Sequence, residues 1–410
     1  MVEIPDQRTA RRIIGQLRSG VPQPEPAVIR FLHIGREKWL QGIQRDIDDA
    51  CEADASTVRF LKGYYGDGKS HFLLMTMWLA LQKKVVVSYV SVERSQIKAF
   101  DFELIWKAVI ENLGTPESHG ESEGIGGLLN RWCEEMADIG PALAGIDRLT
   151  RLEPNFRQAI RGFVRAYFEG TGTDIYLRWF QGDNLRPPGI GTRIDQRNSH
   201  FMMRSLSYFL KHIGYGGIMV LMDELELILD QTPRVRNSAY ESLRQLVDNP
   251  LNLPGYIFIG AATPEMFTNQ RGFSEYTALQ QRAGLAFGLQ RHDEPINYRS
   301  VVVDLERTPL NTSELVLIAE NIRAIFGSAY ACDASLLLPD GELSELVQYI
   351  EKGMADLSKP RMVVTTTVDI LDKKQDDPGY DVLNRIPNDV RLVAERIQLQ
   401  EQQRHRQIGA

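Results

Sequence analysis

The stretch that decides the fold is Gly63-Tyr64-Tyr65-Gly66-Asp67-Gly68-Lys69-Ser70. It fills the pattern G-x-x-x-x-G-K-[ST] and lies between a β-branched, apolar segment at 57–62 and an apolar segment at 71–81. The first segment predicts a buried strand, and the second predicts a helix that is buried on most of its surface. A loop between such elements points backbone N–H groups and the positive end of a helix dipole at one spot. The pattern therefore predicts a site for the phosphates of a nucleoside triphosphate.

The lysine and the serine of this loop have separate expected tasks. Lys69 would reach the β- and γ-phosphates, and Ser70 would hold Mg²⁺ with its hydroxyl. The residues that we expect around the phosphates are Gly63, Gly66, Asp67, Gly68, Lys69, Ser70 and His71. The alternative is a glycine-rich turn without a ligand, which the flanking strand and helix disfavour.

Composition places the chain among soluble globular proteins. Its 410 residues can hold one large domain with an appendage, or two to three small domains, and 43% hydrophobic with 25% charged residues is ordinary. No apolar run is long enough to span a bilayer and the N-terminus lacks a signal-peptide pattern, so we expect a cytoplasmic protein without membrane contact. Cys51, Cys133 and Cys332 lie far apart, and we expect neither disulfides nor a Cys/His metal cluster.

The formal net charge of −7 argues against a protein coated with basic side chains for nucleic acid, although a local patch remains compatible with it. Clusters of arginines in a sequence are more often solvated surfaces than nucleic-acid contacts. The clusters are Arg8, Arg11, Arg12 and Arg18 near the start, Arg157, Arg161 and Arg165 on one helical face, and Arg404 and Arg406 near the end.

Five segments have the buried, β-branched pattern of strands in a parallel sheet. They are 57–62, 85–92, 218–222, 255–262 and 300–305. Helical patterns separate them, so the sequence predicts an α/β protein, a three-layer sandwich around a five-stranded parallel sheet.

Helical periodicity fills the long gap between the second and third predicted strands. Residues from about 100 to 200 predict a helical insertion, interrupted at 114–127 and 182–193, which serves either as a surface for a partner or as a structural lid. After residue 306 three amphipathic helices are expected, at 315–325, 343–350 and 361–371, then a loop at 373–385 and a polar helix at 389–403. The predicted domains are an α/β domain over 1–305, a helical lid over 306–375 and a helical tail over 376–410.

A pair of acidic residues supplies the second half of the candidate site. The apolar strand at 218–222 leads directly into Asp223 and Glu224. In nucleotide hydrolases of this architecture the first acid orients the Mg²⁺ shell and the second polarises a water for in-line attack. An acidic helix start after a strand is the alternative, and the phosphate loop favours the catalytic interpretation. Glu226 is expected to be a charge on a helix surface.

The end of the fourth predicted strand carries another candidate. Thr263 would lie between the attacking water and the γ-phosphate and would sense the phosphate; alternatively it starts a loop or caps a helix before Pro264. Further upstream, Arg36 in the segment Ile34-Gly35-Arg36-Glu37 would either contact the nucleotide base or form a turn into the next helix.

Two arginines are candidates for stabilising charge in the transition state. Arg361 follows Lys359-Pro360 at the start of a helix, from which it would fold back on the phosphates. Arg282 lies beyond the fourth strand and would project to a neighbouring subunit, with Arg271 as the competing choice. A surface salt bridge is the alternative for each.

Together these residues resemble an AAA+ ATPase of the group that contains origin-recognition and Cdc6-type initiators. More narrowly, residues 60–73 (FLKGYYGDGKSHFL) and Tyr215-Gly216-Gly217 leading to Asp223-Glu224-Leu225-Glu226 resemble the ATP-binding family of the BREX phage-resistance system. The likeness runs over most of residues 8–375. The shorter BrxD members match this length better than the large BrxC proteins.

The resemblance implies a bacterial cytoplasmic ATPase that uses ATP and Mg²⁺ and acts with a helicase, a methyltransferase and other components of phage defence. It also implies a homo-oligomer, because AAA+ sites are completed by an arginine from the next subunit. Initiators carry a C-terminal winged helix for DNA, and the residues after the predicted lid are too few for one. Contact with DNA would then come from the insertion, the N-terminus or a partner.

Three functions follow from these patterns. The first is an ATP-driven switch or motor on duplex DNA, and the second is an ATP-dependent scaffold whose slow hydrolysis times assembly. A kinase or GTPase is the third, and it is disfavoured because the sequence has no N-K-x-D guanine motif.

Overall fold

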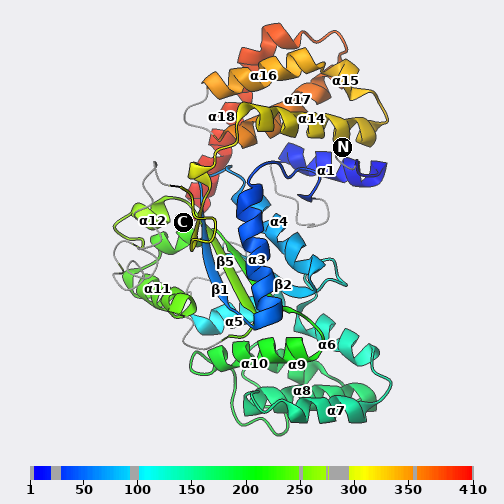
Figure 1. Ribbon diagram of the computed structural model, residues 1–410, viewed down its shortest axis with the longest axis vertical. Coiled ribbons are helices and arrows are strands. Elements are labelled where there is room, and N and C mark those ends of the chain that lie inside the picture. Colours follow the sequence, from blue (N-terminus) through cyan, green and yellow to red (C-terminus); the bar gives the residue numbers. More distant parts are fainter. Residues whose placement is uncertain are drawn as a thin grey trace. The chain divides into compact units, whose positions relative to one another are not determined.

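The computed structural model describes residues 4–19, 29–92, 101–248, 253–273, 276, 295–353 and 358–408 (Figure 1). Contacts between Cα atoms divide the chain into two compact units. The sheet unit comprises Lys38–Lys62 and Thr76–Val303, and the helical unit comprises Met1–Glu37, Gly63–Met75 and Asp304–Ala410. The predicted domain boundaries at 305 and 375 stay predictions.

A six-stranded sheet forms the centre of the sheet unit, in the order β3-β2-β4-β5-β1-β6. The strands are β1 (Thr57–Lys62), β2 (Val85–Ser91), β3 (Leu113–Gly114), β4 (Gly217–Asp223), β5 (Tyr256–Ala262) and β6 (Val302–Asp304). β2 pairs with β4, β4 with β5 and β5 with β1, all in parallel. Every residue of β4 and β5 is buried, which requires helices on both faces of the sheet. The predicted α/β architecture is confirmed.

The sheet has six strands where five were predicted, because the short strand β3 adds to the edge of β2. It is only two residues long and pairs antiparallel with β2, Leu113 opposite Ser88 and Gly114 opposite Val87. A strand of two residues has no periodicity that a sequence could display. It forms because the chain reverses after the preceding helix and passes along the exposed edge of β2.

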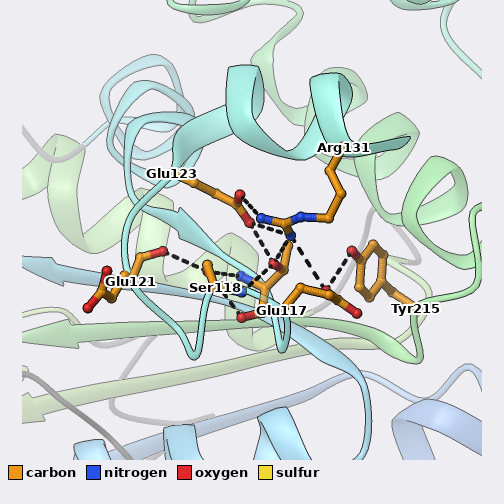
Figure 2. A network of polar contacts seen from close by, with 7 residues as sticks. Glu117, Ser118, Glu121, Glu123, Arg131 and Tyr215 are labelled. Atoms are coloured by element: carbon orange, nitrogen blue, oxygen red, sulfur yellow. Dashed lines mark hydrogen bonds and ion pairs between the residues drawn. The ribbon is translucent and has the colours of Figure 1, made fainter. Parts of the chain in front are cut away.

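The Gly/Ser/Glu-rich stretch after β3, predicted to be a break, is held by a network of polar side chains. Figure 2 shows Arg131 reaching from its helix toward Glu123 and Glu117. Arg131 also donates to the Thr115 hydroxyl, and Tyr215 donates to the Glu117 carboxylate at 3.0 Å. Because one guanidinium supplies several donors in a fixed plane, it fixes both ends of this loop.

Helices fill the rest of the predicted insertion, as the periodicity predicted. They are α5 (Phe102–Glu111), α6 (Gly124–Glu134), α7 (Ile139–Arg148), α8 (Pro154–Glu169), α9 (Asp174–Phe180) and α10 (Ser199–His212). α8 begins where Glu153 accepts a hydrogen bond from the Phe156 N–H and ends at Gly170 in the left-handed conformation. Phe156 packs against Trp106 of α5, whose indole N–H donates to the Phe180 carbonyl at 2.7 Å. The insertion therefore shares one hydrophobic core with the sheet.

The other elements of the sheet unit connect its strands. They are α3 (Glu37–Ala53), α4 (Lys69–Gln82), which begins in the helical unit, the 3₁₀ helix η1 (Leu225–Asp230), α11 (Pro233–Asp248) and α12 (Glu265–Thr268). Arg59 of β1 is 2% exposed, pairs with Asp46 of α3 and donates to the Ser300 carbonyl at 2.5 Å. This buried guanidinium ties β1 to α3 and to the segment that leads into β6.

The helical unit has a separate hydrophobic core. Its elements are α1 (Gln7–Ser19), the 3₁₀ helix η2 (Leu305–Arg307), α14 (Thr312–Tyr330), α15 (Ala334–Leu337), α16 (Asp340–Gly353), α17 (Lys359–Asp376) and α18 (Val382–Ile408). The three helices predicted after residue 306 are confirmed, and the predicted loop at 373–385 is shorter because α17 runs to Asp376 and α18 begins at Val382. α18 contributes Val390 and Val393 to the core.

Part of the N-terminal arginine cluster is used inside the helical unit. Arg11 donates to the Ala329 carbonyl at 2.8 Å, and Arg18 binds Asp372 and the Tyr330 hydroxyl. These contacts attach α1 to α14 and α17. The side chains of Arg404 and Arg406 lie outside the described part of the chain. Among the described helices none combines the length and the apolar character that crossing a membrane requires.

We predict that replacing Asp46 with alanine lowers the free energy of unfolding by about 3–5 kcal/mol, because Arg59 would keep a buried charge without its carboxylate. Chemical denaturation measures this. The matched control is Asp49→Ala on the same helix, since Asp49 pairs with Arg299 at the surface, where about 1 kcal/mol or less is expected. Equal losses in the two variants would show that burial of the Arg59 pair is unimportant.

Candidate functional site

Two glycines give the loop before α4 its shape. Gly66 and Gly68 have φ angles of +83° and +84°, which side-chain-bearing residues rarely adopt. A Cβ added to Gly66 would lie 2.7 Å from the Ser358 Cβ, so the neighbouring chain also requires glycine there. The Asp67 carboxylate accepts the Tyr64 N–H at 2.7 Å, and burial raises the pKa of that carboxyl. The loop is thus a backbone cradle at the start of a helix.

Lys69 is the first residue of α4 and folds over the loop that precedes it. Its ammonium donates to the carbonyls of Gly63 and Tyr64 at 2.9 and 3.1 Å, and it lies 5.0 Å from the centre of the Tyr65 ring. The residue is 7% exposed. A buried ammonium held at the mouth of a backbone cradle is suited to exchange these carbonyls for phosphate oxygens. Ser70 follows it in the first turn of α4.

Arg36 lies beside the same loop, within the helical unit. One of its terminal nitrogens would be 3.3 Å from a Cβ placed on Gly68, and its φ of +65° is unusual for a non-glycine residue. Burial lowers the pKa of Arg36 to about 10, while Asp67 and Glu314 act to raise it. The structure therefore brings Arg36 to the phosphate loop, and its predicted contact with the base stays a prediction.

A stacked pair of histidines adjoins Arg36, and of the two only His71 was predicted from the sequence to belong to the site. The rings of His33 and His71 lie 5.4 Å apart and nearly parallel. Burial lowers the pKa of His33 to about 4 and that of His71 to about 3, and Arg36 acts in the same direction on both. Within the described residues neither ring nitrogen of His33 has a well-formed hydrogen bond. Since an unsatisfied buried nitrogen costs about 1–3 kcal/mol, His33 is a candidate for contact with a ligand.

The acidic pair lies at the carboxyl end of β4, in the sheet unit. Asp223 is 5% exposed and accepts hydrogen bonds from the Tyr89 hydroxyl at 2.8 Å and from the Glu224 N–H at 2.9 Å. Glu224 has φ +65° and ψ +37°, a left-handed conformation that costs a glutamate about 1–2 kcal/mol. Such strain is retained where the surroundings fix a side chain for a task.

The residues that hold these acids come from the neighbouring strand β2. Ser91 lies opposite Asp223 in the parallel register, and its hydroxyl is 3.1 Å from the Glu224 carboxylate. Tyr89 lies two residues earlier, on the same face of β2. Neither residue was predicted from the sequence to belong to the site. Their polar positions near the end of an apolar strand were a signal, but the pairing of β2 with β4 gave it meaning.

Thr263 follows β5 and is buried. Its backbone N–H donates to the Glu226 carboxylate at 3.3 Å, and its carbonyl accepts from Met266 at the start of α12. The expectation that Glu226 is a helix-surface charge is wrong, since that residue is 6% exposed. The reason is that η1 follows Glu224 directly, and its tighter turn directs Glu226 inward.

Of the two candidate arginines, the structure describes Arg361 and not Arg282. Arg361, in the first turn of α17, has its Cβ 3.1 Å from a Cβ placed on Gly66, and its guanidinium donates to Gln400 at 3.2 Å. It thus lies beside the phosphate loop within the helical unit. Arg282 lies outside the described residues. The competing choice, Arg271, is exposed, and its carbonyl accepts from the Tyr240 hydroxyl.

The chain is similar to a known protein family and to a solved structure. The model of the family described as BREX system ATP-binding protein BrxC/D matches residues 5–389. The Walker-type ATPase PABY2304 of Pyrococcus abyssi is similar in structure with a TM-score of 0.43 and 13% identity, over 92% of this chain and 76% of that chain. No curated protein matches the sequence.

We predict that stability falls as the pH is lowered from about 6.5 toward 4, because the unfolded chain then binds protons that buried His33 and His71 exclude. Each histidine should contribute a loss on the order of 3 kcal/mol over this range, because one pKa unit corresponds to about 1.4 kcal/mol. A His33→Leu variant should depend less on pH in this window. Urea denaturation at several pH values measures the effect, and His119→Gln in an exposed loop is the control. A His33→Leu variant as acid-sensitive as the parent would contradict the assignment.

Proposed function

The chain belongs to the BREX system ATP-binding protein BrxC/D family, and we propose that it binds ATP with Mg²⁺ and hydrolyses it as a switch. The observation that carries the proposal is the cradle formed by Gly66 and Gly68 with Lys69 folded over it. In the proposal, the Lys69 ammonium leaves its loop carbonyls for the β- and γ-phosphates, and the loop N–H groups hold the same oxygens.

The oxygen donors of the chain fit Mg²⁺. The Ser70 hydroxyl and the Asp223 carboxylate are hard oxygen ligands of the kind that this ion takes, and Tyr89 keeps the Asp223 carboxylate oriented. When bound, Mg²⁺ neutralises charge on the phosphates. Arg36, whose guanidinium lies beside Gly68, would add positive charge to the phosphate loop. His33 and Arg36 together make the segment 29–37 the proposed neighbour of the base and sugar.

Glu224 is the proposed base. Its carboxylate would accept a proton from the attacking water, and Ser91 would hold that carboxylate in place beforehand. Thr263, anchored by Glu226, would contact the water or the γ-phosphate. The left-handed backbone of Glu224 supports this role, because it presents the carboxylate beyond the end of β4.

Arg361 would report the state of the phosphates to the helical unit. The start of α17 already meets the phosphate loop at Gly66, so a change in the loop reaches α17 directly. Arg282 would act on a neighbouring subunit of a homo-oligomer. Movement of these helices is the proposed output, used on duplex DNA together with other BREX components such as a helicase and a methyltransferase.

An ATP-dependent scaffold is the second candidate function. In that case hydrolysis would be slow and indifferent to DNA, and ATP would time the recruitment of partner proteins. The two candidates differ in what limits turnover, so turnover measured with and without DNA separates them.

We predict that Glu224→Gln keeps ATP binding and lowers turnover by about 10²–10⁴-fold, because a positioned base typically contributes that much. Lys69→Ala should instead lose ATP binding. Turnover and ATP binding are measured on purified protein with and without duplex DNA, and the exposed Glu265→Gln is the control.

Turnover that rises with DNA in the parent and disappears in Glu224→Gln would support the DNA-coupled switch. Turnover that ignores DNA but requires Glu224 would favour the scaffold. Parental turnover retained in Glu224→Gln would refute the assigned base.

A further inference from the structure

Positive charge is concentrated in part of the insertion of this acidic protein. Between residues 139 and 212 there are eleven Arg and Lys against six Asp and Glu, whereas the whole chain has a formal charge of −7. Some of these arginines are used internally, as in the ion pairs Arg161–Asp147, Arg178–Asp183 and Arg197–Asp195. The surplus that remains is a local field of the sign that attracts anions.

A cleft of about 650 Å³ opens beside these helices, within the sheet unit. It is lined by Asp54, Ala55, Ser56, Arg151, Arg204, Tyr208, Leu253 and Pro254. The lining segments at 54–56 and 253–254 lead directly into the first residues of β1 and β5, so the cleft lies at the amino edge of the parallel sheet. Asp223 and Glu224 lie at the opposite, carboxyl edge. The cleft is therefore separate from the acid pair.

Two arginines of the cleft are braced by aromatic rings. The Arg151 guanidinium lies 5.4 Å from the centre of the Tyr208 ring and donates to its hydroxyl at 2.9 Å. The Arg204 guanidinium lies 5.4 Å from the Phe201 ring, and its buried Nε has no hydrogen-bond partner among the described residues. Arginines that are already placed by a neighbouring ring lose little freedom when they bind an anion, and an unpartnered donor is stabilised by one.

The one carboxylate in the lining is offset by a lysine. Asp54 forms an ion pair with Lys211 of α10, whose ammonium also donates to the Ala50 carbonyl at 2.8 Å. The charges of Arg151 and Arg204 are thus not cancelled by Asp54. The Tyr208 hydroxyl accepts from Arg151 and keeps its own O–H, a donor of the kind that contacts phosphate oxygens in nucleic-acid complexes.

Positive charge also continues beyond the cleft along the α7–α8 pair, whose helices lie side by side (Figure 1). Arg161 holds the pKa of Asp147 below its usual range through a hydrogen bond, and Arg157 and Arg165 act in the same direction. Three arginines therefore face one carboxylate on this surface. An extended anion with repeated charges uses such a surface better than a small one does.

We propose that this cleft, with Arg151 and Arg204 as its phosphate-binding forks, binds the phosphodiester backbone of a nucleic acid. This inference rests on the nucleic-acid partner in the proposed function and gives it a location, at the sheet edge opposite the acid pair. An acidic peptide offers carboxylates to the same arginines, but the added Tyr208 hydroxyl and the charge along α8 favour phosphates.

The test is a double variant, Arg151→Gln with Arg204→Gln. Binding of a fluorescently labelled DNA duplex is followed by anisotropy over a series of salt concentrations, with and without ATP. We expect the double variant to bind about tenfold or more weakly and to reduce the salt slope by roughly 2, because two phosphate contacts are lost. Arg197→Gln, which is 90% exposed and pairs with Asp195 in the same insertion, is the matched control.

A second variant should change DNA affinity in the opposite direction, and it does not remove an arginine. Asp54→Asn leaves Lys211 unneutralised at the cleft, so DNA should bind several-fold more tightly. ATP turnover without DNA should stay unchanged in both variants, which separates failure of this site from failure of the ATP site.

Three outcomes would overturn the proposal. DNA affinity unaffected by the double variant would place the contact elsewhere. Competition by polyglutamate for the cleft, with no DNA binding, would assign it to an acidic protein partner. Binding of inorganic phosphate at the cleft, again with no DNA binding, would make it a site for small anions.

Discussion

Parallel pairing of β4 between β2 and β5 is the constraint that places the candidate acids Asp223 and Glu224. Parallel strands present all their carboxyl ends at one edge, so Asp223, Ser91 and Ala262 reach the same side of the sheet. β1 pairs with β5 in the same sense, and the chain leaves it at Lys62 to enter the phosphate loop at Gly63. A shift of register by one residue would reverse every side chain and would separate Tyr89 and Ser91 from the acids.

The helical unit brings a second kind of constraint, a loop that tolerates almost no added volume. Gly66 meets Ser358 and Arg361 so closely that a methyl group would not fit, and Gly68 meets Arg36. Within the helical unit, two segments therefore lie against the loop. One is the start of α17, and the other is the segment that carries Arg36 and His33. The burial that lowers the pKa of both histidines shows how tightly that segment is packed. A movement of so tightly packed a loop would therefore displace the segments that contact it.

The two edges of the sheet differ in the charged side chains that they carry. Acids collect at the carboxyl edge, where a cation is expected to offset them, and arginines of α10 and the α7–α8 turn collect at the amino edge. The insertion contributes to the same hydrophobic core as the strands, through residues such as Phe156 and Trp106. It is thus packed into the core of the sheet and is not a loosely attached lobe, which suits a surface that holds a partner in a fixed place.

Local patterns determined much of this protein. The eight residues from Gly63 to Ser70, the apolar strand before Asp223 and the helical periods after residue 306 each depend on neighbours along the chain, and the structure places strands and helices where those patterns predicted them. Only the tertiary structure decided the features that depend on contacts between segments far apart in the sequence. β3 exists because an edge of β2 was open, Glu226 is buried because η1 turns inward, and Tyr89 and Ser91 hold the acids because β2 lies beside β4. His33 stacks on His71, and Arg151 meets Arg204 in one cleft, across distances in sequence that no local pattern encodes. The physical reason is that periodicity records which face of an element is buried, whereas a site depends on which elements become neighbours.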